Sequence, residues 1–216
     1  MKKQKKEKAP DLTLEVSARS KGYSNIAGVD EVGRGPWAGP VVAAAVVLNW
    51  EKLEFLPYLE INDSKKLSAS KRKKIFDLLP SYASFGIGLA QVNEIDNLNI
   101  LKASLLAMSR AISDLPKKPD YIFVDGNNLP KLPCSGEPIV RGDCCSISIA
   151  AASIVAKVTR DNIMTKLAEA HPGYGWERNS GYGTPEHKKA LVQLGVTEHH
   201  RISYAPIIKM LGEIKP

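Results

Sequence analysis

The chain has 216 residues, of which 44% are hydrophobic and 25% charged, and its net charge is +7; these values are ordinary for a globular protein of one or two domains. The longest apolar run is about eight residues, far below the ~20 that a membrane-spanning helix needs. Lysines near the N-terminus precede no apolar signal-peptide region. The composition therefore predicts a cytoplasmic protein without a membrane segment.

The positive charge is concentrated in two stretches, MKKQKKEK at 1–8 and KKLSASKRKK at 65–74. Basic clusters attract polyanions because binding releases counterions from phosphates. Charge alone nevertheless favours a disordered tail and a solvated helix face over a nucleic-acid surface. We expect residues 1–20 to be a basic, disordered leader and residues 21–216 to form a single catalytic domain.

The N-terminal half predicts three strands. A short apolar segment at 26–33 comes first, the β-branched run PVVAAAVVL at 40–48 indicates a buried strand, and SFGIGLAQV at 84–92 alternates as a third strand does. We expect these strands to form an antiparallel meander, and a short helix is possible at 69–79.

The C-terminal half predicts helices and two further strands. Apolar residues recur every three or four positions from Ile95 to Leu115, which indicates one long helix capped by Asn93. Strands are expected at 120–128 and 137–143, a buried helix at 146–170, a loop at 171–183, and a helix from Thr184 to Gly195. The order predicts an α/β fold with a mixed central sheet and covering helices.

Acidic residues follow apolar, strand-like runs at three places. The segments AGVDEVG, IFVDGN and VRGDCC end in Asp30 with Glu31, in Asp125 and in Asp143, each next to glycine or one residue from it. In open α/β sheets, functional groups gather at strand ends. Clustered carboxylates need compensating charge, and oxygen-rich sites of this kind suit Mg²⁺ or Mn²⁺. The sequence therefore predicts a site for two divalent ions, although each acid taken alone could cap a helix or a turn.

Adjacent acids pose a geometric problem, because neighbouring residues of a strand point to opposite faces. Asp30 and Glu31 can meet one metal if the strand ends or bulges there, or if one of them contributes its backbone carbonyl. The four histidines are expected to have capping or core roles, and no serine lies in a nucleophile elbow.

Seven motifs together resemble the ribonuclease HII family, a type 2 ribonuclease H. They span residues from about 26 to 208 in the order that the family shows: AGVDEVGRGPWAGPVVAAAVVL (27–48), DSKKLS (63–68), FVDGN (123–127), RGD (141–143), AAASIVAKVTRD (150–161), SGYGT (180–184) and HHRISYAPI (199–207). The resemblance implies a ribonuclease H-like fold with additional C-terminal helices. It also implies hydrolysis of the RNA strand of RNA–DNA hybrids, and incision on the 5′ side of single ribonucleotides in duplex DNA that leaves 3′-hydroxyl and 5′-phosphate ends.

The resemblance also implies roles for individual residues. The family's four catalytic, metal-binding acids correspond to Asp30, Glu31, Asp125 and Asp143, and two Mg²⁺ or Mn²⁺ ions are the implied cofactors. The 2′-hydroxyl is read by the family's Gly-Arg-Gly motif, here Gly33, Arg34 and Gly35, and Tyr182 packs against sugar at the DNA–RNA junction. The candidates for contact with the phosphate backbone are Lys65, Lys66, Ser153 and Lys157, although a solvated surface role suits each lysine equally well.

Two alternatives stay open at this point. Ribonuclease HIII has an N-terminal domain longer than this leader and a different residue between the two glycines, so Arg34 favours ribonuclease HII. A noncatalytic module that binds hybrids is the second alternative, but its acids would repel phosphate without metal. We expect a monomer whose partners are RNA–DNA hybrids and DNA duplexes that contain ribonucleotides.

Overall fold

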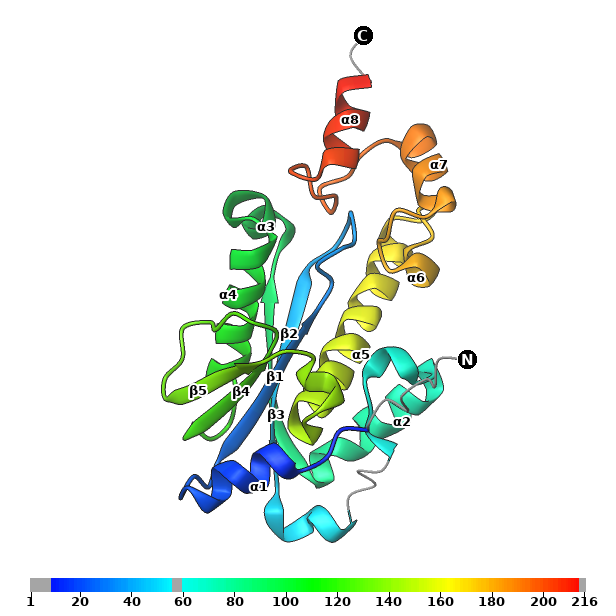
Figure 1. Ribbon diagram of the computed structural model, residues 1–216. Helices are drawn as coiled ribbons and strands as arrows, with labels where there is room; N and C mark the ends of the chain where they lie inside the picture. The colour runs from blue at the N-terminus through cyan, green and yellow to red at the C-terminus, as the bar shows by residue number, and fades with distance from the viewer. Residues whose placement is uncertain (1–8, 56–59, 214–216) are drawn as a thin grey trace, which may run out of the picture.

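A computed structural model of the protein describes residues 9–55 and 60–213 (Figure 1). Its centre is a five-stranded sheet with the order β3-β2-β1-β4-β5. The strands are β1 (Ile26–Val32), β2 (Val41–Leu48), β3 (Ala83–Ala90), β4 (Tyr121–Asp125) and β5 (Ser135–Ile139). Strands β1, β2 and β3 form the expected antiparallel meander, whereas β4 and β5 run parallel to β1. The predicted mixed sheet is confirmed.

Helices cover both faces of this sheet. Figure 1 shows α4 and α5 on opposite sides of it, with α1 at one end and α7 and α8 at the other. The helices are α1 (Thr13–Ser20), α2 (Ala69–Leu78), α3 (Val92–Leu98), α4 (Ile100–Ser113), α5 (Ile147–Ala170), α6 (Trp176–Asn179), α7 (Pro185–Leu194) and α8 (Ala205–Glu213). Short 3₁₀ turns lie at Trp50–Phe55, Ser64–Lys66, Leu79–Ser81 and Gly142–Cys144. None of the helices within the described ranges is long and apolar enough to cross a membrane.

Strand β2 is apolar throughout because both of its faces are covered. Ala44 and Val46 pack into the cluster that contains α5, whereas Ala43 and Ala45 pack into the cluster that contains α4. The N-terminus of α5 also presses closely on β1, since a Cβ at Gly28 would lie 2.3 Å from the backbone nitrogen of Ile149. This close approach fixes the start of α5 beside the strand that carries Asp30.

The single helix expected between residues 93 and 115 is wrong, because the structure has two helices that meet at Asn99. Asn99 has φ 72°, a left-handed conformation that asparagine tolerates better than most residues, and its side chain caps α4 by accepting from the N–H groups of Leu101 and Lys102. The cap of α3 is also not Asn93: Gln91 and Glu94 form a capping box instead. Apolar periodicity continues across the break, which explains why the pattern concealed it.

The leader differs from the expectation where the structure describes it. Residues 1–8 lie outside the described residues, but Thr13–Ser20 forms helix α1 rather than a disordered segment. Its Glu15 is buried, and Glu15 Oε1 accepts from Ser148 N at 2.9 Å and from the hydroxyls of Ser146 and Ser148. A carboxylate at the N-terminus of α5 satisfies free N–H groups and complements the helix dipole. Helix α1 is therefore tied to the start of α5.

Other boundaries differ by a few residues. Strand β5 ends at Ile139, so Asp143 lies in a 3₁₀ turn before α5 and not at a strand end, and Ser146, not Asp143, caps α5. The loop expected at 171–183 contains the short helix α6. The helices expected at 69–79, at 146–170 and from Thr184 to Gly195 are present.

Candidate active site

The register of the parallel strands places two acids next to each other. The β1–β4 ladder ends with Val29 paired to Val124, so the next residues in line are Asp30 and Asp125. One carboxylate oxygen from each of Asp30, Glu31 and Asp125 lies within 4.8 Å of the others. Residues 95 positions apart in the sequence are thus brought together by the sheet.

Asp30 and Glu31 meet without a bulge. Both keep regular antiparallel partners on β2, Asp30 with Ala44 and Glu31 with Ala43. The pairing of β1 with β4 has already ended at Val29, which leaves this edge of the strand open to side chains. Asp30 Oδ1 accepts a hydrogen bond from the backbone N–H of Glu31 at 2.7 Å. The two carboxylates therefore converge around the end of the sheet, although their residues alternate along the strand.

A second acidic group adjoins the first. Asp125 Oδ1 accepts from Gly142 N at 2.6 Å, which holds the 3₁₀ turn that carries Asp143 against β4. Ligand atoms of Asp143, Asp63 and Cys144 lie within 4.8 Å of one another. Asp63 was not among the predicted site residues, although it stands in the DSKKLS motif. The four predicted acids are thus gathered at one end of the sheet, with Asp63 as an addition.

The carboxylates carry more negative charge than their surroundings compensate. Burial raises the pKa of Asp30 well above its usual value, and the charges of Glu31 and Asp125 raise it further. Burial also raises the pKa of Glu31 against the opposing charge of Arg34, and that of Asp125 against the N–H of Gly142. A buried cluster with raised pKa values is typical of a functional site.

The donor set fits divalent cations. Glu31 Oε2 is buried and has no hydrogen-bond partner, so this lone pair points into the protein without compensation. Carboxylate oxygens are the ligands that Mg²⁺ and Mn²⁺ prefer. Lys65 Nζ, 3.8 Å from Asp143 Oδ2, supplies one positive charge; partial burial disfavours its charged form, but Asp63 and Asp143 outweigh this and raise its pKa. Lys65 and Arg34 together do not balance four or five acids, which favours metal ions as the remaining charge.

The Gly-Arg-Gly loop beside the acids is held by two buried arginines that the sequence analysis did not assign. Arg201 donates to the carbonyl oxygens of Gly33 at 2.5 Å, Arg34 at 2.9 Å and Gly39 at 2.8 Å. Arg160 donates from Nη2 to the Ala38 carbonyl and from Nε to that of Pro40. These five carbonyls fix the backbone of the loop.

Gly33 is required by its conformation and by its surroundings. It has φ +95°, and a Cβ there would lie 2.2 Å from Arg160 Nε. Arg34 projects outward, with half of its side chain exposed, and Arg34 Nη1 lies 3.3 Å from Glu31 Oε1. The loop therefore presents one cation and exposed backbone directly beside the acids.

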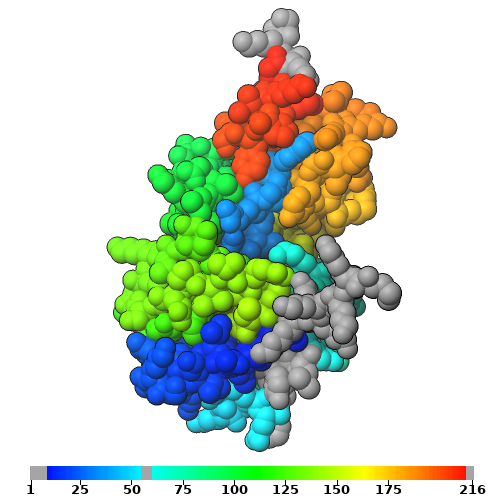
Figure 2. Space-filling view, in the orientation of Figure 1, coloured from blue at the N-terminus to red at the C-terminus, as the bar shows by residue number. Residues whose placement is uncertain are grey.

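Tyr182 lies against this loop. A Cβ on Gly35 would be 3.4 Å from Tyr182 Cε1, and 47% of the Tyr182 surface is exposed. Its neighbour Gly181 accepts from the N–H groups of Trp37 and Ala38. Figure 2 shows the light-blue β1–β2 region at the surface between the green α3–α4 region and the orange α6–α7 region, with α8 above it. The structure thus joins Gly35 and Tyr182, which are 147 residues apart in the sequence.

A pair of buried histidines supports Tyr182 from behind. Thr197 N donates to His200 Nδ1 at 2.9 Å, so the proton of His200 is on Nε2, which donates to His187 Nε2 at 3.1 Å. His187 Nε2 also accepts from the indole of Trp176, and its Nδ1 donates to the Tyr182 carbonyl at 3.0 Å. The predicted core role of these two histidines is confirmed, and the network fixes both as neutral.

The remaining predicted residues differ in their surroundings. Ser153 is buried, and its hydroxyl accepts from Ser64 N at 3.3 Å, so its geometry favours support of the 63–66 segment over direct contact with phosphate. Lys157 Nζ pairs with Asp161 Oδ1 at 2.7 Å on α5. Lys65 faces the acids, whereas Lys66 follows it on an exposed turn.

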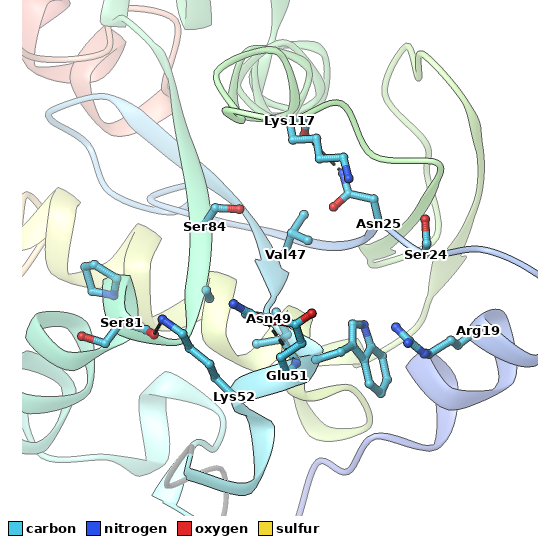
Figure 3. A pocket seen from close by; sticks show the side chains of 14 residues that line it. Arg19, Ser24, Asn25, Val47, Asn49, Glu51, Lys52, Ser81, Ser84 and Lys117 are labelled. Atoms are coloured by element: carbon cyan, nitrogen blue, oxygen red, sulfur yellow. Dashed lines mark hydrogen bonds between the residues drawn. The ribbon is translucent and has the colours of Figure 1, made fainter.

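Two pockets differ in their relation to the acids. A pocket of ≈ 60 Å³ is lined by Glu31, Arg34 and Asp125 together with residues of α4. A larger pocket of ≈ 590 Å³ lies at the other end of the sheet, near Asn25 and Ser84 (Figure 3). Two of its cations are already engaged, since Lys52 donates to the Ser81 carbonyl and Arg19 lies over the ring of Trp50. The larger of these two pockets is therefore not the one that adjoins the acids.

The comparison with protein families decides the assignment. A sequence model of the family described as Ribonuclease HII matches residues 27–207. The chain belongs to the ribonuclease HII family. It is therefore a ribonuclease H enzyme, and this family acts on RNA–DNA substrates. The match confirms the resemblance and separates the chain from ribonuclease HIII and from a noncatalytic binding module.

Individual relatives agree with this assignment. Ribonuclease HII from Ruegeria pomeroyi is 54% identical over 203 residues, covering 94% of this chain and 85% of that protein. Ribonuclease HII from Rhodospirillum rubrum is 54% identical over 205 residues, covering 94% and 92%. The crystal structure of ribonuclease H2 from Pyrococcus horikoshii superposes with a TM-score of 0.74 at 28% identity, covering 88% of this chain and 98% of that one. A crystal structure of Bst-RNase HIII in complex with Mn²⁺ has a TM-score of 0.72 at 19% identity, covering 93% and 73%, and shows the shared fold alone.

Proposed function

We propose that this ribonuclease HII incises duplex DNA on the 5′ side of a single embedded ribonucleotide, as well as cutting the RNA strand of hybrids. The observation that supports this most is the contact of the Gly33–Gly35 loop with Tyr182, directly beside the carboxylates of Asp30, Glu31 and Asp125. The loop and Tyr182, which are proposed to recognise the sugar of the ribonucleotide, then lie on the same surface as the acids.

The acids hold the divalent cations. Asp30 and Asp125 offer adjacent carboxylates, and Glu31 Oε2 is buried without a partner and thus available. When bound, two Mg²⁺ or Mn²⁺ ions supply the Lewis-acid charge for hydrolysis of a phosphodiester to 3′-hydroxyl and 5′-phosphate ends. Asp143 lies on the turn that Asp125 holds in place, beside Lys65.

The loop and the tyrosine select the site of cleavage. The 2′-hydroxyl distinguishes RNA from DNA at a given position, and glycines let the backbone approach a sugar closely. The carbonyls of Gly33 and Arg34 are already engaged by Arg201. The N–H groups of this loop and the half-exposed guanidinium of Arg34, which also pairs with Glu31, are the groups that can meet the ribonucleotide. The exposed ring of Tyr182 offers a flat apolar face to the adjacent deoxyribose.

The remaining residues position the duplex. Lys65 and Lys66 provide charge for the phosphates near the acids, and Ser153 fixes the segment that carries them. Lys157 lies further along α5 and is paired with Asp161. Each lysine contact is expected to contribute affinity that falls with salt, without sequence preference.

The test compares three duplexes of one sequence in the presence of Mg²⁺: one with a single ribonucleotide, one with four consecutive ribonucleotides, and one of DNA alone. We expect a cut 5′ of the single ribonucleotide, cuts within the run of four, and no cut in DNA. Asp30→Asn should abolish both cuts while circular dichroism stays unchanged. Cleavage of the four-ribonucleotide duplex alone would refute the single-ribonucleotide activity, and undiminished cleavage by Asp30→Asn would refute the acidic centre.

A further inference from the structure

A second cluster of ligating side chains lies away from the acids, at the junction of α5 with the segment before Arg201. His171 is the C-cap residue directly after α5, and Glu198 and His199 follow α7. One ligand atom from each of these three residues lies within 4.8 Å of the others. The cluster shares no residue with the acidic site.

The two imidazoles are held in place by aromatic packing. The rings of His171 and His199 meet edge to face with centroids 4.8 Å apart. Both also contact the fully buried ring of Trp176, at 5.9 Å and 6.1 Å between centroids. Because Trp176 belongs to the core of this part of the protein, the imidazoles are positioned before any ligand arrives.

The carboxylate completes the set and is free to adjust. Glu198 Oε1 lies 3.9 Å from His199 Nε2, longer than a hydrogen bond, and 81% of the Glu198 side chain is exposed. Ligands of a tetrahedral zinc ion, each about 2.1 Å from the metal, lie roughly 3.4 Å apart. A different side-chain rotamer of the exposed Glu198 and a small movement of one imidazole ring would bring the ligand atoms to this distance from one another.

We propose that His171, Glu198 and His199 form a binding site for Zn²⁺ or a similar late first-row divalent ion, with water as the fourth ligand. Two imidazoles and one carboxylate suit such ions, whereas Mg²⁺ prefers the oxygen-only set at the acids.

The ion would connect two elements that serve the loop beside the acids. Helix α5 carries Arg160, and His199 is two residues from Arg201; these two arginines hold the backbone of residues 33–40. A metal bridge between the end of α5 and residues 198–199 therefore stabilises the arrangement from outside the site. Its role is structural, and Zn²⁺ binding should raise the stability of the protein.

The test measures Zn²⁺ binding to the full chain by calorimetry in excess Mg²⁺. We compare the wild type with His171→Asn, Glu198→Gln and Asp30→Asn. The wild type and Asp30→Asn should each bind one equivalent at this site, His171→Asn should lose roughly tenfold or more in affinity, and Glu198→Gln should lose several-fold. Glu198 is exposed, so this variant reports on binding even if a histidine variant folds poorly.

Thermal unfolding provides a second readout that does not depend on activity. At zinc concentrations about 100-fold above Kd, the Tm of the wild type should rise by roughly 5 °C or more, and that of His171→Asn should not. Loss of the zinc equivalent in Asp30→Asn with no change in His171→Asn would place the ion at the acids and overturn the proposal. Absence of any zinc binding in Mg²⁺ would overturn it as well.

Discussion

Arg201 donates from Nη2 to the carbonyl oxygen of Gly33 at 2.5 Å, across 168 residues of sequence. The same guanidinium reaches Arg34 and Gly39, so a single buried side chain holds both ends of the loop that lies beside the acids. Burial lowers the pKa of Arg201, whereas Tyr204 and Asp96 favour its charged form. Hydrogen bonds to the carbonyls and to the Tyr204 hydroxyl offset the cost of placing this charge inside the protein. The loop is thus ordered before any substrate binds.

Arg201→Lys should therefore impair recognition more than it impairs the fold. An ammonium group cannot donate to three carbonyls in the fork geometry of a guanidinium. Loss of two charged hydrogen bonds of about 1.5–3 kcal/mol each predicts a decrease of tenfold or more in kcat/KM on the single-ribonucleotide duplex. Steady-state kinetics checks this, with Arg110→Lys as the control because Arg110 donates to Glu94 and to the Leu89 carbonyl and not to the loop. Equal kcat/KM values for the two variants would contradict the proposed role of Arg201 in holding the loop.

Tyr182 should act through its ring and not through its hydroxyl. The ring edge faces Gly35 and the side chain is half exposed, so Tyr182→Phe keeps the surface that meets the sugar. Tyr182→Ala should lose about 1–3 kcal/mol of stacking, or roughly 10–100-fold in kcat/KM on a single ribonucleotide. The same assay on the run of four ribonucleotides should show a smaller loss. A Phe variant as impaired as the Ala variant would assign the contribution to the hydroxyl instead.

The sequence predicted the acids but not the parts that hold them in place. Asp30, Glu31, Asp125 and Asp143 could be found because each follows an apolar run and because the motifs stand in a family order. Their convergence depends on the β1–β4 register, in which Val29 pairs with Val124, and no local pattern reveals a register between strands that are 95 residues apart.

The supporting residues were missed for a physical reason. Arg160 and Arg201 stand in the motifs AAASIVAKVTRD and HHRISYAPI, yet arginine in a sequence usually indicates an exposed charge. Their partners are backbone carbonyls, which carry no sequence signal of their own. The same is true of Asn99, whose left-handed conformation divides a helix that periodicity presents as continuous.

Removal of the buried charge at Asp30 should stabilise the metal-free protein. In EDTA at alkaline pH, the ionised Asp30 is buried next to Glu31 and Asp125, which destabilises the fold. Its folded-state pKa is raised, so the wild type loses stability as the pH rises from the usual carboxylate range through that pKa. Asp30→Asn should have a Tm that is a few degrees higher, since each kcal/mol gained in the free energy of unfolding raises the Tm by about 2–4 °C. The difference should shrink towards acid pH.

Magnesium should reverse the order of the two Tm values, so that the wild type becomes more stable than Asp30→Asn. Ions bound by the acids stabilise the wild type by mass action, and Asp30→Asn binds them less tightly. Differential scanning calorimetry with and without Mg²⁺ measures both effects, and Asp77→Asn, an exposed acid paired with Lys73, is the control. A metal-free Asp30→Asn protein that is less stable than the wild type at alkaline pH would contradict the account of uncompensated charge.

The neutral pair His187 and His200 should make the fold sensitive to acid. Burial lowers the pKa of both rings, that of His200 to about 4. A proton on His187 Nε2 would set N–H against N–H at the 3.1 Å contact with His200, and a proton on His200 Nδ1 would face the N–H of Thr197. Above about pH 6.5 both the folded and the unfolded state hold neutral rings, and the stability is complete. As the pH falls below this value, the unfolded state binds protons that the folded state refuses, so the free energy of unfolding decreases by up to about 1.4 kcal/mol per pH unit for each proton. Urea unfolding in EDTA is measured between pH 8 and pH 5, values chosen to bracket the usual histidine pKa of about 6.5. It should show this slope in the wild type and a shallower one in His187→Gln, whereas Lys73→Gln, an exposed control on α2, should keep the wild-type slope. A His187→Gln profile as steep as that of the wild type would show that the pair is not the source of the acid sensitivity.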